Sequence, residues 1–236
     1  MITKNLKEMF DTSYYSDDFD KLLEINALTK TRVDNTKNDV RMHYGIEQSF
    51  FIYAMAKKYK CQNFFEIGTG RGTACYSVSL LDHVNSVETF DIVPHTRKSP
   101  TAVKFKPFYG SNKDIYDLIP YDEKSKIKFN HIYSLDTNYL NNNDGVFDMA
   151  FIDGNHSDYN VIMKDFEHSH QLTKKDGIII FDDYGNFPVV TKVANDVIEK
   201  YPNYEYILVP FRGHYFEEFV NKEKESNSGE LVLFKK

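Results

Sequence analysis

The most informative part of this sequence reads Glu66-Ile67-Gly68-Thr69-Gly70-Arg71-Gly72-Thr73. It follows a short apolar stretch, residues 63–67, and leads into residues 72–81, which have helical spacing. Glycines allow a tight turn with positive φ and let a ligand approach the main chain closely. The free N–H groups at the start of the next helix favour an anionic group. The pattern therefore predicts a strand, a ligand-binding glycine loop and a helix.

Strands and helices alternate along the rest of the chain. The predicted strands cover residues 63–67, 86–92, 127–133, 146–152, 178–181, 204–211 and 230–234. The predicted helices cover residues 45–59, 72–81, 158–172 and 189–201. Such alternation is typical of a parallel sheet with helices on both faces. We expect an α/β fold with a seven-stranded, mostly parallel sheet that ends in an antiparallel hairpin, and with ligands at the carboxyl ends of its strands.

The chain contains no internal repeat and no Gly/Ser/Pro linker, which favours one main domain. Residues 1–44 have weak helical periodicity and are predicted to form a helical N-terminal extension, while residues 45–236 form the ligand-binding domain. Residues 94–125 are interpreted as an exposed insertion, or alternatively as a lid over the substrate pocket. The charged residues 221–230 are predicted to form a solvated hairpin loop.

Composition limits the classes of partner. The 236 residues carry a net charge of −6, which argues against nucleic acid as the main partner, because phosphate binding usually needs a basic excess. No apolar run approaches the roughly 20 residues of a membrane span. The two cysteines, Cys61 and Cys75, are interpreted as reduced thiols of a cytoplasmic protein. We expect a small-molecule substrate.

The glycine loop departs from the dinucleotide-binding pattern G-x-G-x-x-G. Gly68 and Gly70 fit that pattern, but the third glycine comes one place early and Thr73 stands at the expected position. A carboxylate at Glu66 would repel a pyrophosphate, whereas it suits the ammonium group of an amino acid. An NAD-binding oxidoreductase or a non-catalytic nucleotide-binding module is therefore the less favoured alternative.

The string E-I-G-T-G-R-G resembles the first motif of class I S-adenosylmethionine-dependent methyltransferases, which have a Rossmann-like fold. The resemblance implies that the loop glycines face the methionine part of the cofactor, that Thr73 holds its carboxylate and that Asp136 contacts the adenine. Asp91 follows the second strand of the sheet, where an acidic residue binds the ribose hydroxyls in Rossmann-like sites. Glu88, on the other face of that strand, is the weaker candidate. The predicted cofactor-binding residues are Glu66, Gly68, Thr69, Gly70, Thr73, Asp91 and Asp136.

Carboxylates follow two further strands that are predicted to be neighbours. One strand ends in Phe151-Ile152-Asp153-Gly154-Asn155-His156 and the other in Phe181-Asp182-Asp183-Tyr184. Three clustered carboxylates repel one another unless a cation neutralises them. Oxygen ligands suit Mg²⁺, Mn²⁺ or Ca²⁺ rather than Zn²⁺. An alternative is that these acids serve the structure, for example by capping the next segment.

This second pattern resembles the metal-dependent catechol and caffeoyl-CoA O-methyltransferases and, more closely, bacterial methyltransferases that act on macrolide sugars. The resemblance implies that Asp153, Asp182 and Asp183 bind the metal ion. His156 lies where the catechol enzymes have a basic lysine, and a histidine can act as general base near neutral pH. Asp153 and His156 are therefore the predicted catalytic residues. The residue type at His156 departs from the catechol pattern, and Asn155 replaces the basic aspartate of some sugar-modifying relatives.

We expect an enzyme that transfers the sulfonium methyl group to a sugar hydroxyl or a small polyhydroxylated metabolite, with Mg²⁺, Mn²⁺ or Ca²⁺ assisting. A metal-independent methyltransferase of the same fold is one alternative. A hydroxylase is another, because some antibiotic-pathway proteins of this fold carry that name. The resemblance also suggests a homodimer.

Overall fold

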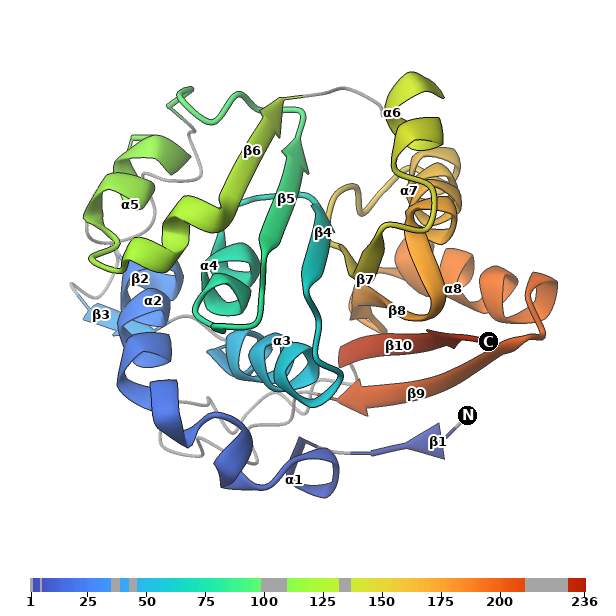
Figure 1. Ribbon diagram of the computed structural model, residues 1–236, viewed down its shortest axis with the longest axis horizontal. Helices are drawn as coiled ribbons and strands as arrows, with labels where there is room; N and C mark the ends of the chain where they lie inside the picture. The colour runs from blue at the N-terminus through green and yellow to red at the C-terminus, as the bar shows by residue number, and fades with distance from the viewer. Residues whose placement is uncertain are drawn as a thin grey trace.

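The computed structural model describes the chain except residues 1, 5, 35–38, 43–45, 99–109, 132–136 and 211–228. For residues 6, 7, 31–34, 39–42 and 137 it describes the main chain only. In this described part, one sheet contains the strands Ile2–Thr3 (β1), Asn63–Ile67 (β4), Ser86–Asp91 (β5), Ile127–His131 (β6), Phe147–Ile152 (β7), Thr173–Tyr184 (β8), Tyr204–Pro210 (β9) and Gly229–Lys235 (β10). Their order in space is β1-β9-β10-β8-β7-β4-β5-β6 (Figure 1).

The remaining described elements are mostly helices. They are Leu6–Met9 (α1), Phe19–Lys30 (α2), Ile46–Lys58 (α3), Thr73–Ser79 (α4), Asn112–Leu118 (α5), Thr137–Asn142 (α6), Tyr159–Leu172 (α7) and Pro188–Lys200 (α8). Short 3-10 helices lie at Thr12–Tyr14, Ser16–Asp18 and Asp122–Lys126, and Thr31–Asp34 (β2) pairs with Asp39–Met42 (β3) in a separate antiparallel sheet. Local chemistry explains where the two longest C-terminal helices begin. Asp158 caps α7 by accepting hydrogen bonds from the main chain of Asn160 and Val161, and proline occupies the first turn of α8.

The sheet changes its winding direction beside β4. This strand is parallel both to β5 on one side and to β7 on the other, and β8 continues the parallel arrangement. Strand β10 is antiparallel to its neighbours β8 and β9. The chain therefore leaves β4 and β7 at adjacent points on the same edge of the sheet, and this is where open α/β sheets bind ligands.

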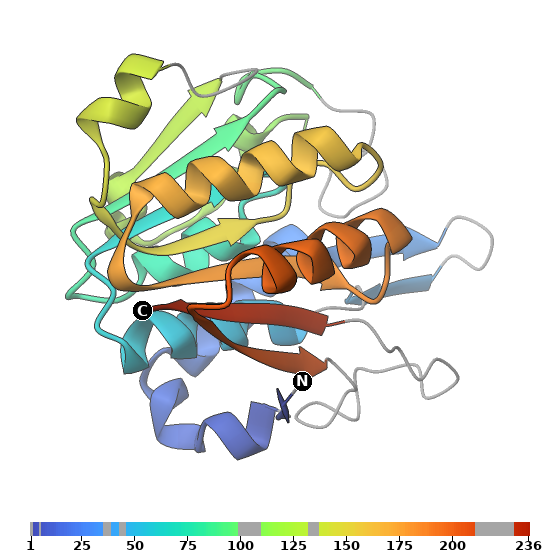
Figure 2. The ribbon, with the colours of Figure 1, turned by 90° about the vertical axis from the view of Figure 1, so that its right-hand side faces the viewer.

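Helices cover both faces of the sheet (Figure 2). Each face has its own apolar core. Successive strand residues face opposite sides, so Phe64 packs in the core with α3 and α4 while Phe65 packs in the core with α7 and α8. Ile180 and Phe181 of β8 divide in the same way. These strands consist of nearly continuous apolar residues because both of their faces are buried.

The predicted sheet and its antiparallel C-terminal hairpin are confirmed, although the strand predicted at residues 178–181 is longer and covers Thr173–Tyr184 (β8). The sheet has an eighth strand, because the short β1 pairs in parallel with β9. The predicted N-terminal helical region contains α2, but β2 and β3 form an antiparallel pair after it. Of the predicted insertion, residues 110–125 include α5, and residues 99–109 lie outside the described part.

Cys61 and Cys75 are buried free thiols, as predicted. Among the described residues, no helix combines the length and the apolar character that crossing a membrane requires.

Candidate active site

The glycine loop joins β4 to α4 and contacts the main chain at the end of β7. Gly68, Gly70 and Gly72 have φ values of +93°, +50° and +83°, in the region that favours glycine. A Cβ atom on Gly68 would lie 2.0 Å from the carbonyl oxygen of Asp153. The loop is held from the other side as well, because Gly68 donates a 2.7 Å hydrogen bond to the carbonyl oxygen of Phe90. Glycine at position 68 is therefore needed for both backbone conformation and space.

Glu66 is a buried carboxyl group at the entrance to this loop. Its side chain is 2% exposed, and its Oε2 atom has no hydrogen-bond partner among the described residues. Burial raises the pKa of Glu66 to about 8. Such a group is stabilised when a cation approaches it. Glu66 lines a pocket of about 240 Å³ together with Thr29, Lys30, Gln48, Thr69, Gly70, Arg71, Thr73, Ala74, Phe151 and Asp153.

Asp91, at the end of β5, is bonded to the same loop. Its Oδ2 atom accepts a 3.1 Å hydrogen bond from the main-chain N–H of Gly70, and its Oδ1 atom accepts one of 2.7 Å from Val93. Glu88 instead contacts Lys128 at 3.1 Å and Tyr139 at 3.1 Å. Asp91 therefore lies against the glycine loop, and Glu88 does not contact it through these bonds.

Two threonines of the loop differ in their surroundings. The Thr69 hydroxyl lies 2.6 Å from the Thr89 hydroxyl in the interior, so its side chain fixes the loop to β5. Thr73 begins α4 and lines the pocket. Asp136, the predicted adenine contact, lies outside the described residues.

The ends of β7 and β8 bring Asp153, His156 and Asp183 together. The Nε2 atom of His156 lies 3.3 Å from Oδ1 of Asp153 and 3.1 Å from Oδ2 of Asp183. One potential ligand atom from each of the three residues lies within 4.8 Å of the others. Hydrogen bonds with Asp153 and then Asp183 raise the pKa of His156 to about 10. At neutral pH an imidazolium therefore lies between the two carboxylates.

Asp183 has a strained main-chain conformation. Its φ of +59° is uncommon for a residue with a side chain, although aspartate tolerates it better than most. Asn186 donates a 2.8 Å hydrogen bond to its Oδ1 atom. Although burial raises the pKa of Asp183, hydrogen bonds from His156 and Asn186 lower it below its ordinary value. Strain of this kind concentrates at functional sites.

Asp182 faces a different set of partners. Its Oδ2 atom accepts a 2.8 Å hydrogen bond from Nε2 of Gln48 in α3, and its Oδ1 atom accepts one of 2.8 Å from the main chain of Asp183. Burial raises its pKa well above the ordinary value, and the charges of Asp153 and Asp183 add to this shift. Of the predicted metal ligands, Asp153 and Asp183 meet at His156, and Asp182 is held beside them by α3.

The site residues predicted from the sequence did not include Gln48, Lys30 and Glu230. Glu230 was expected where the solvated loop 221–230 meets the strand 230–234. The strand is present as β10, but the predicted solvent exposure of Glu230 is wrong, because its side chain is fully inside the protein. Burial raises the pKa of Glu230 well above its ordinary value, and Asp182 adds to the shift. The available signal for Glu230 is its position directly before the apolar string Leu231 to Phe234. Gln48 carries no comparable signal, because a glutamine is ordinary in a helix.

A family model described as "Methyltransferase domain" matches residues 65–184, which include the glycine loop and both acidic strand ends. The chain belongs to this methyltransferase family. The predicted enzyme class and the predicted methyltransferase fold are thereby confirmed. A comparison with curated proteins gives no match.

Solved structures of methyltransferases share the fold. An O-methyltransferase from Bacillus cereus in complex with SAH has a TM-score of 0.58 at 14% identity, with 95% of this chain and 96% of that chain covered. The O-methyltransferase TomG from Streptomyces achromogenes, in complex with SAM, has a TM-score of 0.58 at 11% identity, with 98% and 99% covered. A putative caffeoyl-CoA O-methyltransferase from Staphylococcus aureus has a TM-score of 0.54 at 18% identity, with 98% and 95% covered.

Proposed function

We propose that this methyltransferase transfers the methyl group of S-adenosylmethionine to a hydroxyl oxygen of a sugar or another small polyhydroxylated metabolite, with the assistance of a divalent cation. One observation carries the proposal. A single pocket is lined both by the glycine loop with Glu66 and by Asp153 of the acidic strand ends. A methyl donor on the loop and an acceptor at the acids would therefore share one pocket, and holding both there removes much of the entropic barrier to their reaction.

The pocket suits the amino-acid part of S-adenosylmethionine. The unpaired carboxyl oxygen of Glu66 would accept the ammonium group, and Asp91 stands where the ribose hydroxyls bind in this fold. Thr73, at the start of α4, would bind the cofactor carboxylate. A pyrophosphate would meet the Glu66 carboxyl group instead, which disfavours a dinucleotide. The structures with SAH and SAM bound in the same fold support this assignment of the cofactor.

The acidic strand ends fit a divalent cation. Asp153, Asp182 and Asp183 would hold it through oxygen atoms, and the close approach of Asp153 and Asp183 supports two members of this set. A bound cation would polarise the acceptor hydroxyl, lower its pKa and orient it. A vicinal diol or a catechol offers two oxygens for this purpose, and the caffeoyl-CoA-type structure of the same fold supports oxygen as the methyl acceptor.

In the reaction, the acceptor oxygen forms a bond to the methyl carbon as the carbon–sulfur bond breaks, which gives S-adenosylhomocysteine and a methyl ether. The acceptor proton leaves to His156, which lies beside Asp153. Since the two carboxylates hold a proton on His156 at neutral pH, this histidine must release that proton before it can act as a base.

Calorimetric titration of S-adenosylhomocysteine, with and without Mn²⁺ and with NAD as a control, tests the cofactor. Micromolar binding of the homocysteine product and none of NAD is expected, and the reverse result would overturn the proposal. Methyl transfer to a panel of catechols and sugars, before and after EDTA treatment, tests the cation. Activity that is lost with EDTA and restored by Mn²⁺ supports cation assistance.

A metal-independent methyltransferase is the second candidate. The observation in its favour is that protonated His156 already places a positive charge between Asp153 and Asp183. Activity that persists unchanged in EDTA would select this alternative.

A further inference from the structure

The C-terminal end of α2 forms one wall of the pocket. Thr29 and Lys30, its last two residues, line the pocket together with Gln48 of α3. This helix lies in the N-terminal region, before the methyltransferase family match begins at residue 65. The end of α2 therefore lies next to the glycine loop.

The glycine loop holds this end of α2. The Arg71 guanidinium donates hydrogen bonds to the carbonyl oxygens of Leu28, at 2.8 Å, and Thr29. These carbonyls belong to the last turn of the helix, where a cationic side chain is favourable. Arg71 therefore fixes the position from which the next residue, Lys30, extends.

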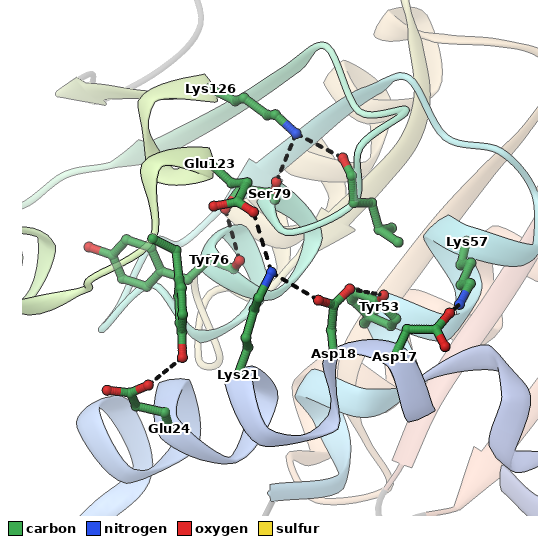
Figure 3. A network of polar contacts seen from close by, with 12 residues as sticks. Asp17, Asp18, Lys21, Glu24, Tyr53, Lys57, Tyr76, Ser79, Glu123 and Lys126 are labelled. Carbon is green, nitrogen blue, oxygen red and sulfur yellow. Dashed lines mark hydrogen bonds and ion pairs between the residues drawn. The ribbon is translucent and has the colours of Figure 1, made fainter.

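Polar contacts also hold the opposite end of α2 to the rest of the protein (Figure 3). Lys21 bridges Asp18 at 3.1 Å and Glu123 at 3.4 Å, and the Tyr53 hydroxyl of α3 donates to Asp18 at 2.5 Å. Glu24 accepts a hydrogen bond from the Tyr121 hydroxyl. Both ends of the helix are thus anchored, which gives Lys30 a defined place.

A chain of hydrogen bonds leads from Lys30 to the acidic strand ends. The Lys30 ammonium donates to Oε1 of Gln48 at 2.9 Å, and Nε2 of Gln48 donates to Oδ2 of Asp182 at 2.8 Å. An ammonium group can only donate, so it fixes which end of the Gln48 amide faces Asp182. The Gln48 side chain is 6% exposed, so little water is available to replace either partner.

We propose that Lys30 and Gln48 are positioning residues of the active site, and that through them α2 sets the orientation of Asp182. This inference rests on the proposed function, in which Asp182 is a cation ligand. Hydrogen-bond partners of metal ligands typically change metal affinity by about 10- to 100-fold when removed. In this proposal α2 contributes to the active site, and the affinity for the cation depends on the position of this helix.

Binding of Mn²⁺, measured by calorimetry and by the loss of the free-ion EPR signal, tests this inference without an acceptor. Gln48→Leu keeps the size and the neutral charge of the side chain and is expected to weaken Mn²⁺ binding about tenfold or more. Lys30→Met is expected to weaken binding too, although removing a nearby positive charge would by itself strengthen it. Lys30→Arg keeps a donor and is expected to stay within about threefold of the wild type.

Lys57→Met is the matched control, because Lys57 of α3 pairs at 2.9 Å with Asp17, away from Asp182. A circular dichroism spectrum and a cooperative urea transition like those of the wild type show that each variant is folded, and this readout does not depend on the pocket that Lys30 and Gln48 line. Wild-type Mn²⁺ affinity in Gln48→Leu, or tighter binding in Lys30→Met, would overturn the inference and leave the proposed function standing. Failure of the wild type itself to bind Mn²⁺ would instead overturn the proposed cation, and the inference with it.

Discussion

Gly68 and Asp153 approach so closely that a Cβ atom on the glycine would lie 2.0 Å from the carbonyl oxygen of the aspartate. This contact joins the cofactor loop after β4 to the acidic end of β7. The main-chain N–H of Asp153 also donates a 2.8 Å hydrogen bond to the carbonyl oxygen of Ile67. The proposed donor and acceptor sites therefore share one main-chain junction.

Gly68→Ala is expected to lower the free energy of unfolding by at least about 3 kcal/mol, because it combines a positive φ with a main-chain clash. Gly145→Ala is the control, since Gly145 has a φ of +60° but no atom within 4 Å of the added Cβ. The control is expected to lose only about 1–2 kcal/mol. Urea denaturation measures both, and equal losses would show that the junction with Asp153 is unimportant.

The affinity for S-adenosylhomocysteine is expected to rise with pH because of Glu66. Burial raises its pKa from 4.5 to about 8, so the empty pocket holds a neutral carboxyl group at pH 6. Pairing with the ligand ammonium needs the ionised form, whose fraction increases about tenfold between pH 6 and pH 7. Calorimetry at these two pH values should show a similar gain, while Glu66→Gln should bind weakly and without this pH dependence.

The same shift affects stability with the opposite sign. A carboxyl group whose pKa is raised on folding stabilises the ligand-free protein fully below pH 4.5, and this contribution is lost as the pH rises through about 8. Stability of Glu66→Gln should therefore fall less than that of the wild type over this range. A parallel decline in both proteins would contradict the assignment of the raised pKa to Glu66.

Asp91→Asn is expected to reduce the affinity for S-adenosylhomocysteine about tenfold or more. The substitution removes the negative charge of a side chain that accepts a hydrogen bond from Gly70 and is proposed to bind the ribose. Glu88→Gln, on the same strand, is the matched control. Glu88 is paired with Lys128 and Tyr139, so its replacement should leave the affinity unchanged. An equal loss in both variants would indicate a general effect on β5.

His156→Asn is expected to destabilise the cation-free protein by about 1–2 kcal/mol at pH 6.5, since Asp153 and Asp183 lose the positive charge between them. The His156 pKa is raised from 6.5 to about 10, so this stabilisation is full below pH 6.5 and is lost as the pH rises through 10. Urea denaturation at several pH values should therefore show the two proteins converging. A difference in stability between the two proteins that stays constant across the pH range would contradict this explanation.

Much of the fold could be predicted from local patterns. The strand Asn63–Ile67 has its predicted bounds, and the helices α3, α4, α7 and α8 begin and end within two residues of their predicted bounds. Glycine spacing, helix caps and apolar runs act between neighbours in the sequence, so their effect can be seen without a structure. The short β1 could not be predicted, because two residues acquire a strand conformation only through pairing with β9, which lies some 200 residues away along the chain.

The sequence by itself determined the α/β fold, the glycine loop and the acidic ends of β7 and β8, because each depends on residues that are close in the chain. Only the tertiary structure decided how these parts meet. It placed His156 between Asp153 and Asp183, and it brought Gln48 to Asp182 across 134 positions of sequence. The reason is physical: a hydrogen bond between distant residues depends on the packing of whole helices and strands, and no local pattern specifies that packing.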